Sequence, residues 1–364
     1  MEIEIELINR IKEEGHISIS DFMKLVLTQS KSSYYRSKNP IGEQGDFITS
    51  PEISQMFGEM IGIWVYQQWL KLGKNHINLV ELGPGNGSLT RDVIKVLSKT
   101  DMQNKFSVRL FEINEELKNA QKESLRSIKQ NVNWIRELDE IENKQSIFLA
   151  NEFFDALPIN QYIKEKNTWK EFILKLSPGA NQIIFDKKQV PDQLDEQFKY
   201  EYIHAKDGAI IEESIEALQI AKFLAQHAKK FDSAALIVDY GYDIKSQDRV
   251  SNQFYSTLQA IKEHKYVPIL DKLGSCDLTA HVDFNKLKLA INSSGAKSFG
   301  TITQRDFLKS LGIDLRANIL MKLNPELKNI LNSQLKRLTD KGQMGNLFKV
   351  LTIAKSETKF IYHS

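Results

Sequence analysis

A strand, a glycine-rich turn and a helix follow one another between residues 77 and 97, and this succession constrains the fold more than any other feature. Apolar residues predict a strand over 77–82, and apolar residues spaced i, i+4, i+7 and i+8 predict a helix over 89–97. The turn between them reads Glu81-Leu82-Gly83-Pro84-Gly85-Asn86-Gly87. Such a succession forms the first unit of a nucleotide-type α/β site, where a ligand lies against bare backbone at the mouth of the sheet.

The spacing of the glycines narrows the kind of ligand. Gly83, Gly85 and Gly87 give G-x-G-x-G, which differs from the G-x-G-x-x-G of the dinucleotide fold. Glu81 stands just before the turn, where it would repel a pyrophosphate and attract an ammonium or sulfonium group. We therefore expect Glu81, the three glycines and Pro84 to line a site for a positively charged ligand. Because any α/β protein can contain a glycine-rich turn, a turn without a ligand remains the alternative.

Composition restricts the broad class of protein. The chain has 364 residues, of which 41% are hydrophobic and 26% charged, as is ordinary for a globular protein of one large α/β domain or two domains. The 49 basic and 47 acidic residues leave a net charge of +2, so no basic surplus argues for nucleic acid. We assign no metal, because no metal-ligand spacing is visible.

Other features bear on the compartment. A single cysteine, Cys276, excludes an internal disulfide and fits a reducing compartment. No apolar run reaches the ~18–20 residues needed to cross a bilayer. The N-terminus is acidic and fits neither a secretory signal nor a mitochondrial presequence. We therefore expect a cytoplasmic protein.

Strands and helices alternate after the first 50 residues, which predicts an α/β fold with a mostly parallel sheet and helices on both faces. The expected strands are short and apolar, near 77–82, 106–112, 132–135, 146–151, 234–240, 297–302 and 346–354. Between 160 and 205, strand-like runs split by Pro178-Gly179 predict an antiparallel insertion. The expected helices are two within 1–30, the second capped by Ser20-Asp21, one capped by Ser50, one over 211–229 and several from 304 to 338.

These elements predict four segments. Residues 1–49 would form N-terminal helices and a loop that covers the ligand, and residues 50–159 the first part of the core. Residues 160–230 would form an insertion, made of a β-hairpin and a helix, on the substrate side. Residues 231–364 would complete the core with C-terminal helices.

An acidic residue, Glu112, ends the second predicted strand, 25 positions after Gly87. A carboxylate at this strand end can accept hydrogen bonds from both ribose hydroxyls of an adenosine. The alternative is a solvated strand-end carboxylate. The glycine turn upstream favours the ribose role.

The fourth predicted strand ends in Asn151-Glu152-Phe153-Phe154-Asp155. Carboxyl ends of strands next to the switch point of a doubly wound sheet face the ligand crevice, so Asn151, Glu152 and Asp155 are candidate site residues. Base-methylating enzymes often have (Asn/Asp)-Pro-Pro-Tyr here, and this chain lacks it. Two carboxylates instead suit a cationic substrate, above all a guanidinium, although Asp155 could simply cap the turn before Pro158.

Two further segments add candidate residues. Gly45, Phe47, Thr49 and Ser50 lie in a run that could close over a bound ligand, and the N–H groups of the helix expected at Ser50 could seat a carboxylate. His281 lies in the polar run Asp277-Leu278-Thr279-Ala280-His281-Val282-Asp283-Phe284. It could act as a general base, although a histidine with a structural role in the core is the commoner outcome.

With these segments together, the chain resembles the MidA-type methyltransferases, a family that includes the mitochondrial assembly factor that methylates an arginine on a complex I subunit. The matching segments are GDFITSPEISQMFGEMIG (45–62), ELGPGNGSL (81–89), NEFFDALP (151–158), DYGY (239–242), DLTAHVDF (277–284) and MGNLFKV (344–350). The family usually has Arg or His at the position of Asn86, and often Thr where Ser88 stands. Both departures are mild, because backbone contacts dominate in that turn.

The resemblance implies a class I, Rossmann-like methyltransferase sheet, S-adenosyl-L-methionine as cofactor and a protein arginine as substrate, expected in a core subunit of respiratory complex I. Without a presequence the chain resembles a bacterial member, and a homodimer is possible. The family pattern marks Glu152 and Asp155 as motif members, and they are our candidates for holding the guanidinium. Two alternatives remain: a methyltransferase acting on a small metabolite or another side chain, and an assembly chaperone that binds the cofactor without transferring its methyl group.

Overall fold

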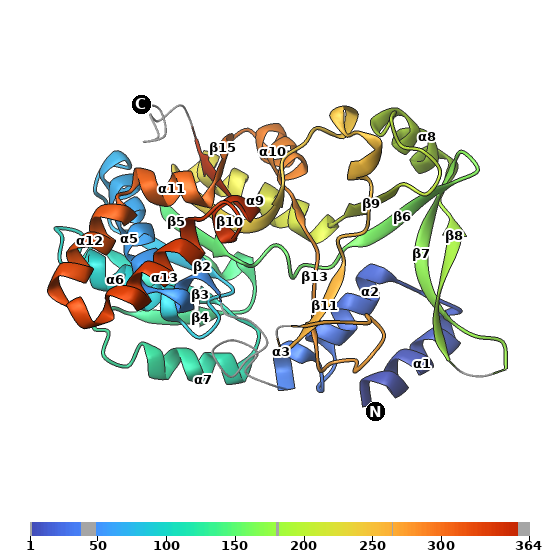
Figure 1. Ribbon diagram of the computed structural model, residues 1–364, viewed down its shortest axis with the longest axis horizontal. Coiled ribbons are helices and arrows are strands. Elements are labelled where there is room, and N and C mark those ends of the chain that lie inside the picture. The colour runs from blue at the N-terminus through green and yellow to red at the C-terminus, as the bar shows by residue number, and fades with distance from the viewer. Residues whose placement is uncertain (1, 38–48, 180–181, 264, 356–364) are drawn as a thin grey trace. The chain divides into compact units, whose positions relative to one another are not determined.

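The computed structural model describes residues 2–37, 49–179, 182–263 and 265–355 (Figure 1). The chain forms two compact units. The sheet unit comprises Ile41–Phe154, Ile220–Gly241 and Leu287–Ser364, and the insertion unit comprises Met1–Pro40, Asp155–Gln219 and Tyr242–Lys286. The four-part division predicted from the sequence remains a prediction; the compact units group its N-terminal segment with most of its insertion.

A central, mostly parallel sheet organises the sheet unit, as predicted. Its strands follow the order β15-β16-β10-β5-β2-β3-β4. They are β2 (Ile77–Leu82), β3 (Phe106–Phe111), β4 (Val132–Ile135), β5 (Ser146–Asn151), β10 (Ala234–Tyr242), β15 (Lys297–Thr303) and β16 (Phe348–Ala354). Neighbours from β10 to β4 pair in parallel, whereas β16 is antiparallel to both β10 and β15.

The order of the parallel strands locates the switch point of the sheet. The chain runs outward from β2 through β3 to β4, and then returns to β5 and β10 on the other side of β2. In such sheets a ligand binds outside the carboxyl ends of the strands where the order reverses. These ends are Leu82 of β2 and Asn151 of β5, and the predicted site residues Glu81 and Glu152 lie beside them.

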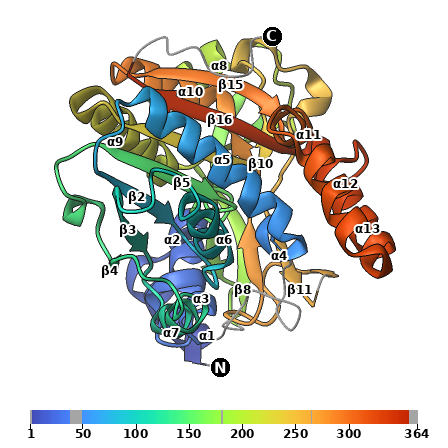
Figure 2. The same ribbon diagram turned by 90° about the vertical axis from the view of Figure 1, so that its left-hand side faces the viewer.

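Helices cover the sheet, and two of them pack unusually closely. Gly58 and Gly62 lie one turn apart on α5 (Gln55–Lys71). A Cβ at Gly58 would lie 2.7 Å from Cβ of Asp92, and a Cβ at Gly62 would lie 2.8 Å from Cβ of Val96. Both contacts are on α6 (Ser88–Leu97), which runs beside α5 (Figure 2). The other helices that include residues of this unit are α4 (Ser50–Ile53), α7 (Glu115–Ser124), α9 (Ile215–Phe231), α10 (Phe284–Ser293), α11 (Gln304–Ser310), α12 (Ile313–Leu323), α13 (Lys328–Thr339) and α14 (Met344–Leu347).

The insertion unit contains two smaller antiparallel sheets, and the antiparallel pairing of β6, β7 and β8 confirms the antiparallel strands predicted between 160 and 205. The larger has the order β1-β7-β6-β9 with β8 on β7, and the smaller has the order β12-β11-β13. Their bounds are β1 (Ile17–Ser18), β6 (Asn160–Glu165), β7 (Thr168–Leu176), β8 (Ile183–Gln189), β9 (Ile210–Glu213), β11 (Gln259–Lys262), β12 (Lys265–Val267) and β13 (Asp277–Thr279). The helices are α1 (Glu2–Glu14), α2 (Ile19–Lys24), α3 (Tyr34–Ser37) and α8 (Asp192–Glu201).

Three predicted helices begin elsewhere than expected. The helix expected at Ser50 is two helices, because Ser54 is extended and its hydroxyl caps α5 by accepting from Met56 N at 3.3 Å; Thr49 rather than Ser50 is the N-cap of α4. The second N-terminal helix is capped by Ser18. The helix expected from 211 begins at 215, since residues 210–213 pair with β6 as strand β9.

Candidate active site

The glycine turn has the backbone that its sequence predicts. Gly83, Gly85 and Gly87 have φ values of +63°, +55° and +82°, a region that favours glycine. A Cβ at Gly83 would also lie 2.8 Å from the ring of Phe153. The turn is closed by a 2.8 Å hydrogen bond from Gly87 N to the carbonyl of Pro84. A larger residue at any of the three would therefore strain this backbone, and one at Gly83 would also collide with Phe153.

Glu81 lies inside the protein at the end of β2. It is 3% exposed, and the hydroxyl of Thr90 on α6 donates to its carboxylate. Burial raises the pKa of Glu81 to about 7, and the bond from Thr90 offsets part of this rise. A positive charge placed beside Glu81 would favour its ionised form.

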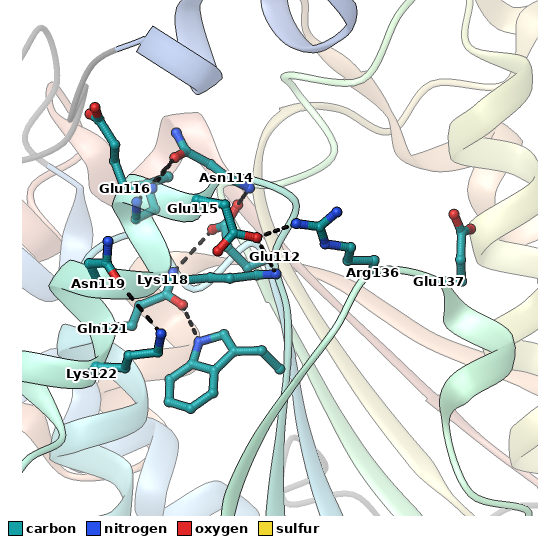
Figure 3. A network of polar contacts seen from close by, with 12 residues as sticks. Glu112, Asn114, Glu115, Glu116, Lys118, Asn119, Gln121, Lys122, Arg136 and Glu137 are labelled. Atoms are coloured by element: carbon teal, nitrogen blue, oxygen red, sulfur yellow. Dashed lines mark hydrogen bonds and ion pairs between the residues drawn. The ribbon is translucent and has the colours of Figure 1, made fainter. Parts of the chain in front are cut away.

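Glu112 has its two carboxylate oxygens fixed by two donors (Figure 3). Asn114 N donates to Oε1 at 2.8 Å, and the Gln121 amide donates to Oε2 at 3.1 Å. Burial raises the pKa of Glu112. Since a carboxylate offers about four acceptor positions, capacity remains for a pair of hydroxyl groups.

Gln121 is a residue of this site that our sequence reasoning missed. Its side-chain amide also donates to the Gly85 carbonyl at 2.7 Å and accepts from the Trp134 indole at 2.7 Å. A sequence signal existed: Gln121 lies four residues after the buried Leu117, on the inward face of α7. A polar residue on such a face needs buried partners.

The turn after β5 is held by buried and partly buried polar contacts. Glu152 has φ of +52°, its N–H donates to Val238 O at 2.9 Å, and its Oε1 accepts from Ser50 N at 2.7 Å and from the Asn151 amide at 3.3 Å. Burial raises the pKa of Glu152. Asp239, which we did not include among the candidate residues, accepts from Phe153 N and Phe154 N at 3.1 and 2.8 Å, and burial raises its pKa as well.

The start of α4 differs from the expected open carboxylate seat. Thr49 N donates to Glu52 Oε2 at 3.2 Å, and Ser50 N donates to Glu152. Both N–H groups are therefore engaged by the protein's own carboxylates. Glu52 also accepts from the Asn86 amide at 2.5 Å, which connects α4 with the glycine turn. Gly45 and Phe47 lie outside the described residues.

Asp155 and His281, the other two candidates, belong to the insertion unit, whereas Glu152 belongs to the sheet unit. The structure brings Asp155 and the segment of His281 together, because Ala280 N donates to the Asp155 carbonyl at 2.9 Å. The backbone N–H of His281 donates to the Thr257 hydroxyl at 2.9 Å. Burial lowers the pKa of His281, which favours its neutral form.

Three features at the switch point suit S-adenosylmethionine. The glycine turn and the buried Glu81 at the end of β2 fit the amino acid part. Glu112 at the end of β3 has acceptor positions left for the ribose hydroxyls. Among the described residues, no group of three or more His, Cys, Asp or Glu side chains is placed to hold a metal ion. None of the described helices has the length and hydropathy to span a membrane. Fold and site together define an S-adenosylmethionine-dependent methyltransferase.

Comparison with known proteins agrees with this assignment to the methyltransferases. Residues 60–302 match the family model described as "Putative S-adenosyl-L-methionine-dependent methyltransferase", and the chain belongs to this family. The chain is 32% identical to the human mitochondrial protein arginine methyltransferase NDUFAF7 over 380 residues, covering 95% of this chain and 82% of the relative. It is 33% identical to the Drosophila melanogaster homologue, covering 94% and 83%.

The fold also matches a solved structure. A protein from Burkholderia thailandensis, crystallised with S-adenosyl-homocysteine, superposes with a TM-score of 0.89 at 21% sequence identity, over 100% of this chain and 94% of that one. The predicted class I methyltransferase fold is thereby confirmed. The family model supports S-adenosyl-L-methionine as the cofactor, as the family resemblance predicted.

Proposed function

We propose that this enzyme transfers the methyl group of S-adenosylmethionine to an arginine side chain of a protein. The observation that carries the proposal is the similarity, over nearly the whole chain, to relatives named as protein arginine methyltransferases. The partly buried acidic candidates Glu152 and Asp155 support it, since carboxylates suit a guanidinium.

When bound, the cofactor supplies an activated sulfonium methyl group. The protein must then align a nitrogen behind this methyl group at ~3 Å. A guanidinium has a pKa above ~12 and reacts from its protonated form, so methyl transfer to nitrogen releases one proton. Glu152 and Asp155 are separate candidates for holding the guanidinium.

The released proton needs an acceptor. Glu152, whose pKa burial raises, is a stronger base than an ordinary carboxylate. His281, whose pKa burial lowers, is neutral at pH 7 and is the alternative acceptor. Replacing His281 with Ala keeps its backbone bond to Thr257, so a folded variant with near-normal turnover would assign this histidine a structural role.

The remaining functional expectations concern the cell. We propose that the enzyme works in the bacterial cytoplasm on an arginine of a complex I core subunit, before assembly while that side chain is accessible. Mass spectrometry of the subunit, from cells with and without this gene, tests this. Loss of methylation on deletion is expected, and an arginine methylated equally in both strains would contradict the target. A small-metabolite substrate, or cofactor binding without transfer, would then be the competing functions.

We also propose a homodimer. Leu315, Ile319 and Leu323 repeat every four residues on one face of α12 and are 68%, 42% and 70% exposed, which leaves an aliphatic stripe that a second copy could cover. Light scattering at micromolar concentration should give twice the monomer mass. The double substitution Leu315→Ser and Leu323→Ser should give the monomer mass, and a monomeric parent protein would contradict the proposal.

A further inference from the structure

Gln121 connects three elements of the cofactor site that lie apart in the sequence. Its amide nitrogen donates to the Gly85 carbonyl in the turn after β2 and to Oε2 of Glu112 at the end of β3. Its amide oxygen accepts from the indole of Trp134 on β4. The side chain is fully buried, so all of these partners must be supplied by the protein.

The chemistry of these partners fixes the orientation of the amide. A backbone carbonyl and a carboxylate only accept hydrogen bonds, whereas an indole N–H only donates. Turning the amide over would therefore set the amide oxygen against two acceptors and the amide nitrogen against a donor. Only the observed orientation satisfies all three partners at once, so position 121 requires a side chain with two donors and one acceptor.

Two consequences follow for the cofactor site. Because a peptide group is planar and trans, holding the Gly85 carbonyl toward Gln121 directs the following N–H, that of Asn86, the opposite way. Burial raises the pKa of Glu112, and the second donor of the Gln121 amide opposes this rise by stabilising the ionised carboxylate. Gln121 thus acts on both the backbone and the carboxylate that we assign to the cofactor.

The packing of α7 supports this role. Asn114 caps α7 by accepting from Glu116 N and Leu117 N at 2.7 and 3.1 Å, which fixes the helix at the end of β3. A Cβ at Gly87 would lie 3.5 Å from Cα of Gln121, so the helix backbone approaches the glycine turn closely at this residue. A fixed helix and a fully bonded amide together determine the separation of the turn and Glu112.

We propose that Gln121 is the positioning residue that sets the spacing between the glycine turn and Glu112 for S-adenosylmethionine, and that Trp134 senses the occupied site through it. The proposal rests on the cofactor assignment and is independent of the protein substrate. The test therefore measures binding of S-adenosyl-homocysteine, so a failure to methylate any protein would leave its outcome unchanged.

Calorimetry compares the parent protein with Gln121→Met and Gln121→Glu. Gln121→Met keeps the bulk and removes the donors, and we expect affinity to fall about 10–100-fold, KM for the cofactor to rise similarly, and kcat to change less than about threefold. Gln130→Met is the matched control, because Gln130 is partly exposed and its side chain donates a solvent-exposed hydrogen bond to Gln103 O at 3.3 Å, away from Glu112 and the glycine turn. Its affinity should equal that of the parent.

Gln121→Glu gives a pH signature that a general packing role would not produce. It places a second carboxyl beside Glu112, which raises the pKa of the pair, and protonation then restores one donor. Relative to the parent at each pH, its affinity should recover about fivefold or more from pH 8 to pH 6. No recovery, or parent-like affinity of Gln121→Met, would overturn the proposal.

Tryptophan fluorescence provides a second measurement, which does not depend on the folding of Gln121→Met. Saturating S-adenosyl-homocysteine should change the tryptophan emission of the parent, and this change should be absent from Trp134→Phe, which retains the other tryptophans. A change that Trp134→Phe retains in full would contradict the coupling between Gln121 and Trp134.

Discussion

The backbone N–H of Ser50 donates a 2.7 Å hydrogen bond to Oε1 of Glu152, a residue 102 positions further along the chain. This bond ties the start of α4 to the turn that follows β5. Glu152 adopts a left-handed backbone there, with φ of +52°. A non-glycine residue in this conformation costs about 1 kcal/mol or more and persists only when its surroundings hold it, as they often do at functional sites.

Glu152→Gln separates the charge of this side chain from its structural bond. The amide oxygen of Gln can still accept from Ser50 N, so we expect the free energy of unfolding to change by less than about 1 kcal/mol. Methyl transfer should nevertheless fall by more than about tenfold if the charge holds the substrate. Chemical denaturation and a single-turnover assay measure the two quantities, and unchanged transfer would assign Glu152 to the fold alone.

Asp155→Asn tests the second carboxylate. Affinity for S-adenosyl-homocysteine should stay within about threefold of the parent while transfer falls by about 10²-fold or more, the result expected for a group that acts on the substrate. Asp192→Asn, on an exposed acid of the same unit, is the control and should change neither. If affinity and transfer of Asp155→Asn drop together, the residue belongs to the cofactor pocket or to the fold.

The glycine turn should not tolerate a side chain. Gly85→Val places a branched residue at φ of +55° where the cofactor must approach the backbone, so calorimetry should detect no cofactor binding by the folded variant. Gly342→Ala is a suitable control, since a Cβ there would meet nothing within 4 Å. Equal binding by Gly85→Val and the parent would remove the cofactor assignment from this turn.

Glu112→Ala should weaken cofactor binding by roughly 1–3 kcal/mol, because ribose hydroxyls would be left without an acceptor in a buried site. Glu116, two residues beyond the Asn114 that bonds Glu112, is exposed and provides the control substitution Glu116→Ala. Calorimetry of both variants with S-adenosyl-homocysteine measures the difference. If Glu112→Ala and Glu116→Ala bind S-adenosyl-homocysteine with equal affinity, Glu112 does not bind the ribose and is a strand-end carboxylate without a ligand.

Stability should depend on pH through Glu81. Its pKa in the folded protein is about 7, above the ordinary value of 4.5, so the folded state retains a proton that the unfolded state loses. Its contribution is complete below about pH 4.5 and disappears as pH rises to about 7, a loss of up to about 3 kcal/mol. Denaturation of the parent and of Glu81→Gln at several pH values isolates the contribution of Glu81. The difference between their free energies of unfolding should change between about pH 4.5 and pH 7. A difference that stays constant would contradict the raised pKa.

Local patterns were sufficient to predict the strands of the central sheet. The bounds of β2 and β5 agree with the prediction, because a buried parallel strand is a short apolar run bounded by polar or turn residues. Local cues also misled: Ser50 resembles an N-cap, but the hydroxyl that caps the long helix is that of Ser54, and the strand formed by 210–213 depends on pairing with β6.

The contacts that complete the site join residues far apart in the chain. Gln121 and Gly85 are 36 positions apart, and Phe154 and Asp239 are 85 positions apart, so no local pattern reveals these hydrogen bonds. The sequence indicates which residues could carry chemistry. It does not indicate that the N–H groups of Thr49 and Ser50, near the start of α4, donate hydrogen bonds to the carboxylates of Glu52 and Glu152.

Incubation of the purified enzyme with methyl-labelled S-adenosylmethionine and extract from cells lacking this gene shows directly whether the enzyme methylates arginine in a protein. The protein fraction is then hydrolysed to amino acids and the labelled species are separated. We predict label in methylated arginine, with Asp155→Asn giving background levels. Label only in a small-molecule fraction or in another amino acid, or no label in the presence of bound cofactor, would contradict a protein arginine methyltransferase.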